Sequence, residues 1–175
     1  MANTESFMQF PNYIDTRKAF DQGMSFQGRV DKKRLLRLVE IMAQPGRLEV
    51  DASLQVFRDD NNFRRISGAV KGVISVYCQR CLNPLVLKMH DDINLVLLES
   101  EGELTNLEPG LDPWIIDGTY LDPSEIIEEQ VLLSMPIVSF HDQGECSNEI
   151  IDGIMVEDSN RELKENPFDV LKTLL

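Results

Sequence analysis

The middle of the chain alternates apolar and polar side chains, the period-two pattern of β-strands that bury one face. Residues 24–30 and 48–56 show it first, and two longer stretches, 63–77 and 85–98, continue it. Asp and Asn residues at 59–62 separate two of these stretches and favour a turn. We therefore predict long antiparallel strands that form most of one sheet.

Two stretches have the three- and four-residue apolar spacing of a helix with one buried face. Asp31 is placed to cap a helix that begins at Lys32 and ends before Pro45. Asp122, followed by Pro123, begins a second helix that ends before Pro136. One flank of this helix is acidic and consists of Glu125, Glu128 and Glu129. We predict that it is a solvated face and not an acid–base catalytic site.

The regions around these elements are less regular. Residues 1–23 show no period, and we expect an arm that lays its aromatic side chains on the domain. Residues 99–113 are acidic and rich in turn formers, which predicts a surface loop. Asp117-Gly118, flanked by Trp114-Ile115-Ile116 and Thr119-Tyr120-Leu121, has the signature of a β-hairpin. Residues 166–175 read as a short C-terminal helix that begins at Asn166.

The predicted fold is α+β: a mostly antiparallel sheet, curved or closed into a barrel, with two to three packed helices. A length of 175 residues suits one domain with its own core. We divide the chain into an N-terminal arm (1–23), an α+β core (24–140), and an acidic tail with a short helix (141–175).

Charge is distributed unevenly along the chain. Residues 1–88 contain 14 Lys and Arg against 9 Asp and Glu, whereas residues 89–175 contain 3 against 21. Such asymmetry suggests a charged partner, namely phosphates for the basic half or a basic protein for the acidic half; packing of one half against the other would also account for it. We predict RNA contacts at six basic residues of the first half: Lys32, Lys33, Arg37, Arg64, Arg65 and Arg80.

The clearest chemical motif is Cys78-Gln79-Arg80-Cys81, a C-x-x-C turn between the two longest predicted strands. Two thiolates at this spacing can bind one tetrahedral metal ion, and the remaining Cys146, with His141 upstream, would complete a Cys₃His set. The site would then hold a structural zinc ion. Asp142 is a candidate to orient the imidazole.

Two other interpretations of this turn remain open. A redox pair would need a cysteine of low pKa at a helix N-terminus, whereas a strand-turn-strand context is predicted here. Alternatively, the turn holds two reduced cysteines without a metal. No phosphate-binding glycine loop, metalloprotease helix or serine-nucleophile motif is present, so we expect neither an enzyme nor a small-molecule substrate.

The predicted localisation rests on the lack of a membrane span and of a signal peptide. No apolar run approaches the length of a membrane span, and residues 1–5 lack a basic segment leading into an apolar one. Three cysteines in a chain without a signal peptide fit a reducing compartment. We expect an acidic cytoplasmic protein that does not bind membranes.

Three stretches in this order resemble the YceD-like proteins, a bacterial family also called large ribosomal RNA subunit accumulation proteins. They are the C-Q-R-C turn with Pro84, the stretch 126–138 leading into His141-Asp142 and Cys146, and the terminal Asn166-Pro167-Phe168-Asp169-Val170-Leu171. The resemblance implies that the three cysteines belong to one site. This chain differs from the many relatives that carry an extra cysteine pair near the C-terminal motif.

The resemblance also implies a role in ribosome biogenesis, in the synthesis, processing or stability of large-subunit (23S) ribosomal RNA, rather than a catalysed reaction. The partners would be ribosomal RNA or large-subunit assembly intermediates. The alternative is an adaptor or chaperone whose acidic half binds a basic ribosomal protein or a processing nuclease.

Overall fold

A five-stranded sheet forms the centre of the molecule. The computed structural model describes residues 10–107, 110–142 and 145–146. The strand order is β2-β3-β4-β5-β6, and all neighbours are antiparallel except β5 and β6, which are parallel. The sheet is open, with β2 and β6 as its outer strands, so the barrel alternative is not realised. The strands are β2 (Ser25–Arg29), β3 (Leu48–Arg58), β4 (Arg64–Tyr77), β5 (Pro84–Leu98) and β6 (Asp112–Ile115).

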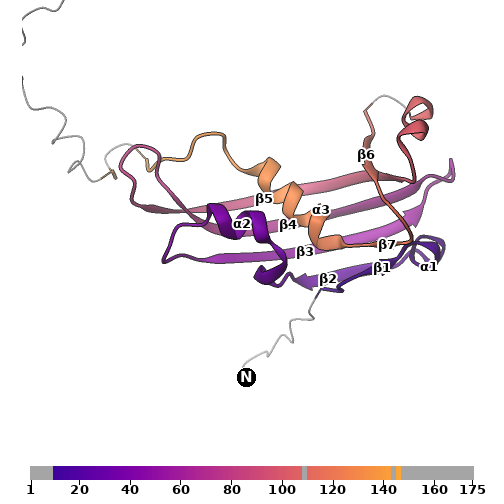
Figure 1. Cartoon of the computed structure of the whole chain (residues 1–175), viewed down its shortest axis with the longest axis horizontal. Helices are drawn as coiled ribbons and strands as arrows, with labels where there is room; N and C mark the ends of the chain where they lie inside the picture. Colours follow the sequence, from indigo (N-terminus) through magenta and orange to yellow (C-terminus); the bar gives the residue numbers. More distant parts are fainter. Residues whose placement is uncertain (1–9, 108–109, 143–144, 147–175) are drawn as a thin grey trace, which may run out of the picture.

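Helices cover one face of this sheet (Figure 1). Both predicted helices are present: α2 (Leu36–Ile41) follows a 3₁₀ turn, η1 (Lys32–Arg34), and α3 (Pro123–Ser134) begins at the predicted proline. Asp122 caps α3 as expected, whereas Asp31 caps the η1 turn and not α2 itself; each accepts a backbone N–H two residues ahead. The aperiodic N-terminal stretch contains a helix that the sequence did not reveal, α1 (Thr16–Gln22).

The predicted hairpin around Asp117-Gly118 is wrong. β6 joins the outer edge of β5, whereas β7 (Tyr120–Leu121) pairs with β1 (Ile14–Asp15) in a separate two-stranded sheet. The tight connection exists, and Gly118 takes the positive φ of 99° that such a turn requires. Its two arms diverge because each finds another strand to pair with. The surface segment before β6 contains a 3₁₀ turn, η2 (Glu101–Asn106).

The core lies between the sheet and the helices. Alternate residues of β3 from Leu48 to Val56 are buried, and in β4 Ile66, Val70 and Ile74 continue the same surface. From α3, Ile127 and Val131 pack into this cluster. Full burial of each such side chain contributes about 1.5–3 kcal/mol. The opposite face of the sheet carries mostly polar residues, which are half-buried or exposed.

Glu128 corrects the prediction of a solvated acidic face on α3. Its side chain is buried, and its Oε1 accepts the backbone N–H groups of Arg37 (2.8 Å) and Leu38 (3.2 Å) at the start of α2. These are donors that a helix N-terminus leaves unsatisfied. A carboxylate from α3 therefore caps α2 and joins the two helices.

Some predictions concern residues outside the described part of the chain. They are the first nine residues of the arm, the tail after Cys146 and the terminal helix at 166–175. Among the described residues, no helix has the length and apolar character needed to span a membrane.

Candidate metal centre

The C-x-x-C motif forms the turn between β4 and β5, as the strand pattern predicted. The Cys78 N–H donates to the carbonyl oxygen of Asn83 (2.9 Å), and the Leu82 N–H donates to that of Cys78 (2.9 Å). Leu82 adopts the left-handed conformation, with φ of 59°. This fold brings both cysteine side chains to the inside of the turn, where they are buried.

The segment after α3 brings the other two side chains to the same turn. The carbonyl oxygen of the buried Ser139 accepts the Gln79 N–H (2.9 Å), which fixes the segment against the tip of the hairpin. His141 and Cys146 follow, and both are half-buried. Residues sixty or more positions apart in the sequence therefore meet at one end of the sheet.

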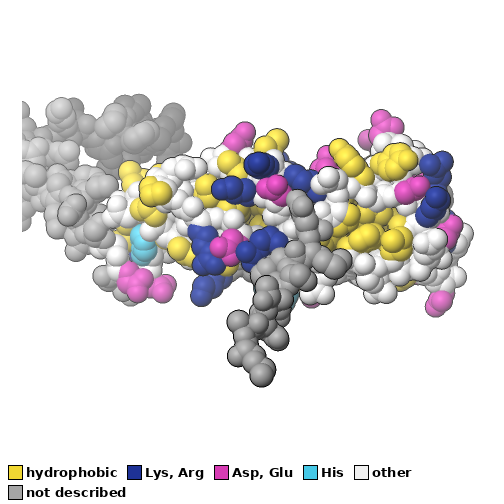
Figure 2. Space-filling model, turned by 90° about the horizontal axis from the view of Figure 1, so that it is seen from below, with side chains coloured by type: hydrophobic (Ala, Val, Ile, Leu, Met, Phe, Trp, Pro, Cys, Tyr) yellow, Lys and Arg dark blue, Asp and Glu magenta, His cyan; other side chains and the backbone are white. Residues whose placement is uncertain are grey.

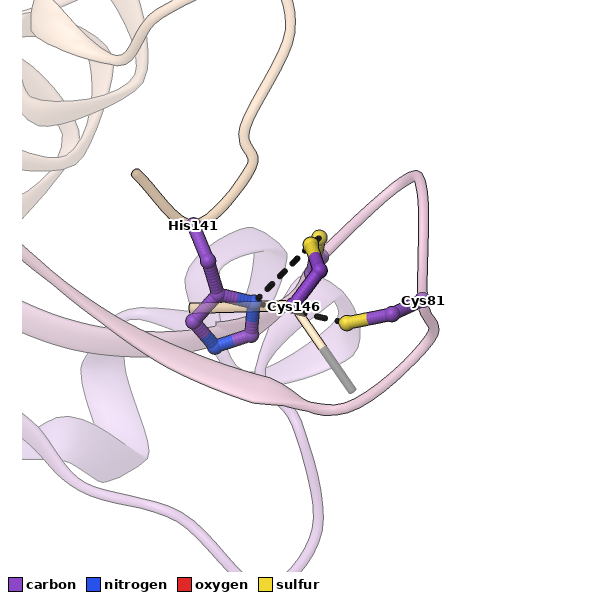
Figure 3. Close-up of side chains that lie close together, drawn as sticks. Cys81, His141 and Cys146 are labelled. Carbon is purple, nitrogen blue, oxygen red and sulfur yellow. Dashed lines mark hydrogen bonds between the residues drawn. The ribbon is translucent and has the colours of Figure 1, made fainter. Parts of the chain in front are cut away.

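The four side chains converge as the sequence predicted. Cys78 Sγ lies 3.7 Å from Cys146 Sγ, and His141 Nδ1 lies 3.4 Å from Cys81 Sγ and 3.8 Å from Cys146 Sγ. Figure 3 shows the imidazole nitrogen directed at the two sulfur atoms. All four ligand atoms lie within 4.8 Å of one another. In a tetrahedral zinc site, Zn–S and Zn–N bonds of about 2.3 and 2.0 Å separate neighbouring ligand atoms by roughly 3.5–3.8 Å. The set therefore fits zinc.

The imidazole is oriented by a backbone carbonyl. His141 Nε2 lies 3.2 Å from the carbonyl oxygen of Pro84, so Nε2 carries the proton and Nδ1 presents its lone pair to the sulfur cluster. Asp142, the orienting group we predicted, is an exposed turn residue whose carbonyl accepts the Glu145 N–H. Pro84, which the chain places just after the motif, has the role instead.

Arg80 holds the two halves of the site together. Its Nε donates to Cys146 Sγ (3.0 Å) and a terminal nitrogen donates to the carbonyl oxygen of His141 (3.2 Å). The guanidinium also lies 5.9 Å from the centre of the Phe140 ring. Three thiolates and a bound divalent ion would leave one net negative charge, which the Arg80 cation would balance.

Ionisation of the thiols depends on these contacts. Burial opposes ionisation of Cys78, but backbone N–H groups of Cys81, His141 and Arg80 donate to its sulfur and lower its pKa to about 5. Burial raises the pKa of Cys146, although Arg80 opposes the shift. Hydrogen bonding to the Cys78 sulfur raises the pKa of His141. The hydrogen bonds to its sulfur therefore favour the thiolate form of Cys78.

The predicted RNA-contacting residues occupy different environments. Arg37 pairs with Glu129, Arg64 with Glu99 (3.0 Å) and Arg65 with Asp59 (3.9 Å). Figure 2 shows Lys and Arg side chains in the middle of one face, with Asp and Glu side chains among them. Lys32 and Lys33 are exposed, and neither forms an ion pair within the described residues.

The sequence did not predict that two residues, Arg80 and Phe140, belong to the candidate metal centre. Arg80 was assigned to RNA, yet it points into the cysteine cluster; its place between two candidate thiolate ligands was the available signal. Phe140 had no signal, because only the folded chain places its ring beside the guanidinium.

Comparison with known families gives one match. The model of the family described as "Large ribosomal RNA subunit accumulation protein YceD" matches residues 66–175, more than half of the chain. The matched region includes all four residues of the candidate centre. No solved structure matches the chain.

Proposed function

Because the chain belongs to the YceD family of large ribosomal RNA subunit accumulation proteins, we propose that it is a non-enzymatic factor in ribosome biogenesis. It supports the synthesis, processing or stability of large-subunit ribosomal RNA in the cytoplasm. Family membership is the observation that carries this proposal. The Cys₃His cluster adds to it, because its closed set of four ligands is typical of structural rather than catalytic zinc sites.

A zinc ion bound by these four residues would have a structural role. Cys78 and Cys81 belong to the β4–β5 hairpin, whereas His141 and Cys146 follow α3, and the described residues between Met135 and Cys146 form no helix or strand. One ion bound by all four would fix that segment to the end of the sheet. The 29 residues after Cys146, most of the acidic tail, would then start from a defined point.

Direct RNA binding would depend first on Lys32 and Lys33. They are exposed cations at the start of the η1–α2 segment, while Arg37, Arg64 and Arg65 would have to exchange a carboxylate for a phosphate. Phosphate contacts release counterions, so the affinity for large-subunit RNA should fall about tenfold or more when salt rises severalfold. A double variant, Lys32→Glu with Lys33→Glu, should weaken binding and flatten this salt dependence.

The matched control reverses two exposed lysines elsewhere, Lys18→Glu with Lys71→Glu. Equal losses in both double variants would show only a nonspecific charge effect. An affinity that is insensitive to salt and to Lys32 and Lys33 would exclude RNA contact by this surface.

The internal pairing of three arginines favours a second candidate, an adaptor that binds a basic protein through its acidic half. Affinity purification of the tagged protein from its own cells at low salt, with crosslinking, distinguishes the two. Direct crosslinks to large-subunit RNA support the RNA-binding factor. Capture of one basic ribosomal protein or nuclease, unchanged after RNA digestion, supports the adaptor. Recovery of neither would contradict the proposed role.

A further inference from the structure

Residues 84–94 of β5 form a sheet edge that no strand of the described chain covers. β5 pairs with β4 from Pro84 to Leu97, but β6 covers only Leu95–Leu98. Where β6 lies alongside, Val96 and the two residues after it are buried, whereas every even-numbered residue from 84 to 94 is exposed. A long uncovered edge is a template for another strand, and native proteins seldom leave one open.

The backbone groups that point outward from this edge belong to even-numbered residues. The Cys78 N–H donates to the Asn83 carbonyl, so the odd-numbered residues of β5 are those that bond to β4. In agreement, two even-numbered carbonyls point away from β4: that of Pro84 accepts from His141, and that of Leu98 accepts the Ile116 N–H. Five further residues direct their N–H and C=O groups outward between these ends: Val86, Lys88, His90, Asp92 and Asn94.

This edge is complementary to itself in the antiparallel direction. If two copies pair about His90, Lys88 of each copy lies opposite Asp92 of the other, and Leu87 lies opposite Ile93 on the helix-covered face. In this register each even-numbered residue, whose N–H and C=O groups point outward, lies opposite an even-numbered residue of the other copy. Residues 86–94 of the two copies would therefore form about ten backbone hydrogen bonds. Opposite charges facing each other across two strands stabilise the pairing.

We propose that the protein self-associates through β5 as a two-fold symmetric dimer, in which the sheets of two copies become one continuous sheet. The charge complementarity of the edge with itself favours a second copy over an unrelated strand. A two-fold dimer is also the closed arrangement that a self-complementary patch produces.

Charge reversal tests the register. Each single variant, Lys88→Asp or Asp92→Lys, replaces two attractive pairs by two repulsive ones in the dimer. Each should weaken self-association of the zinc-loaded full chain, measured by sedimentation equilibrium, about tenfold or more. The Lys88→Asp, Asp92→Lys double variant restores both pairs with the charges exchanged, so it should associate nearly as well as the wild type.

The control is Lys71→Asp, which makes the same charge change on the same sheet face in β4, whose backbone is paired on both sides. It should leave the dimer unchanged. Amide exchange followed by NMR checks the edge without any substitution: the N–H groups of Val86, Lys88, His90 and Asp92 should become protected as protein concentration rises. A chain that stays monomeric, or a dimer indifferent to both single reversals, overturns the proposal.

Discussion

Arg80 illustrates how the folded environment decides what a charged side chain does. By residue type it suits phosphate binding, yet its guanidinium donates to Cys146 Sγ and to the His141 carbonyl. The hydrogen bond to the Cys146 sulfur raises the pKa of Arg80 further, so its charge is permanent. In a metal-bound centre, a cation at this position would offset the repulsion among three closely spaced thiolates.

Removal of the Glu128 carboxylate should destabilise the fold. Glu128→Ala would leave two backbone donors of α2 without their acceptor, one buried and one partly buried, so the free energy of unfolding should fall by about 1–3 kcal/mol. Glu128→Gln keeps an acceptor oxygen and should cost less. Glu125→Ala, an exposed change on the same helix, should stay within about 0.5 kcal/mol. Urea denaturation measures all three, and equal losses for Glu128→Ala and Glu125→Ala would contradict the capping role.

Cys78 allows a prediction about pH in the metal-free protein. With its pKa near 5 instead of 9, the thiolate should persist at neutral pH and disappear as the solution is acidified through about pH 5. A lowered pKa stabilises the fold at high pH; this contribution starts to decline below pH 9 and is lost as pH falls through 5. Thiolate ultraviolet absorbance during an acid titration measures the transition.

The matched variants for this titration are Cys78→Ser and Cys146→Ser. The first should remove the absorbance at neutral pH, whereas the second should retain it, because the pKa of Cys146 is raised rather than lowered. If the absorbance appeared only above pH 8 in the unmodified protein, the acidifying hydrogen bonds to Cys78 would be excluded.

Among the helices and strands, the β4–β5 hairpin is the element that the local sequence predicts best. Long strands on both sides fix the start and end of the turn, and the turn holds the two cysteines. One residue conflicts with this geometry. Leu82 has a positive φ, a conformation that costs a residue with a Cβ atom about 1–2 kcal/mol.

Leu82→Gly should relieve this cost. The Leu82 side chain is 61% exposed, so its removal sacrifices little packing. The gain in the free energy of unfolding should reach up to about 1 kcal/mol, the remainder being lost to the greater freedom of glycine in the unfolded chain. Leu82→Ala keeps the strained backbone and should give no gain. Thermal unfolding of the zinc-loaded proteins compares them, and a Leu82→Gly variant less stable than Leu82→Ala would refute the argument.

At the scale of the whole molecule, the core and the candidate metal centre are stabilised separately. The core cluster lies between the sheet and the helices, while the cysteines lie beyond it at the tip of one hairpin. Loss of the metal should therefore release the segment 139–146 without unfolding the sheet.

Chelation tests this separation. In the zinc-loaded protein, proteolytic cleavage within residues 139–146 should be slow, and a chelator should accelerate it about tenfold or more by local opening. Far-ultraviolet circular dichroism should change little. The Cys78→Ser, Cys81→Ser double variant should be cleaved rapidly without chelator. Cleavage that is equally fast with and without metal would argue against a structural ion.

The features that depend on neighbours along the chain could be predicted from the amino-acid sequence alone. The alternation of side chains predicts β2 to β5, because a strand's buried face repeats every second residue. Asp31 and Asp122 predict where helices begin, because a cap acts within three residues. The four candidate ligands could also be predicted, because the sequence contains only three cysteines and two histidines.

Which distant segments meet could be seen only in the folded chain. The strands around Gly118 pair with β5 and β1 rather than with each other. Glu128 caps a helix that begins 92 positions earlier, and the Arg80 guanidinium bonds to Cys146. Each depends on a contact between residues far apart in sequence, where hydrogen-bonding groups compete for partners. Local pattern predicts that such groups need partners, but the packing of the whole chain selects which partner each one finds.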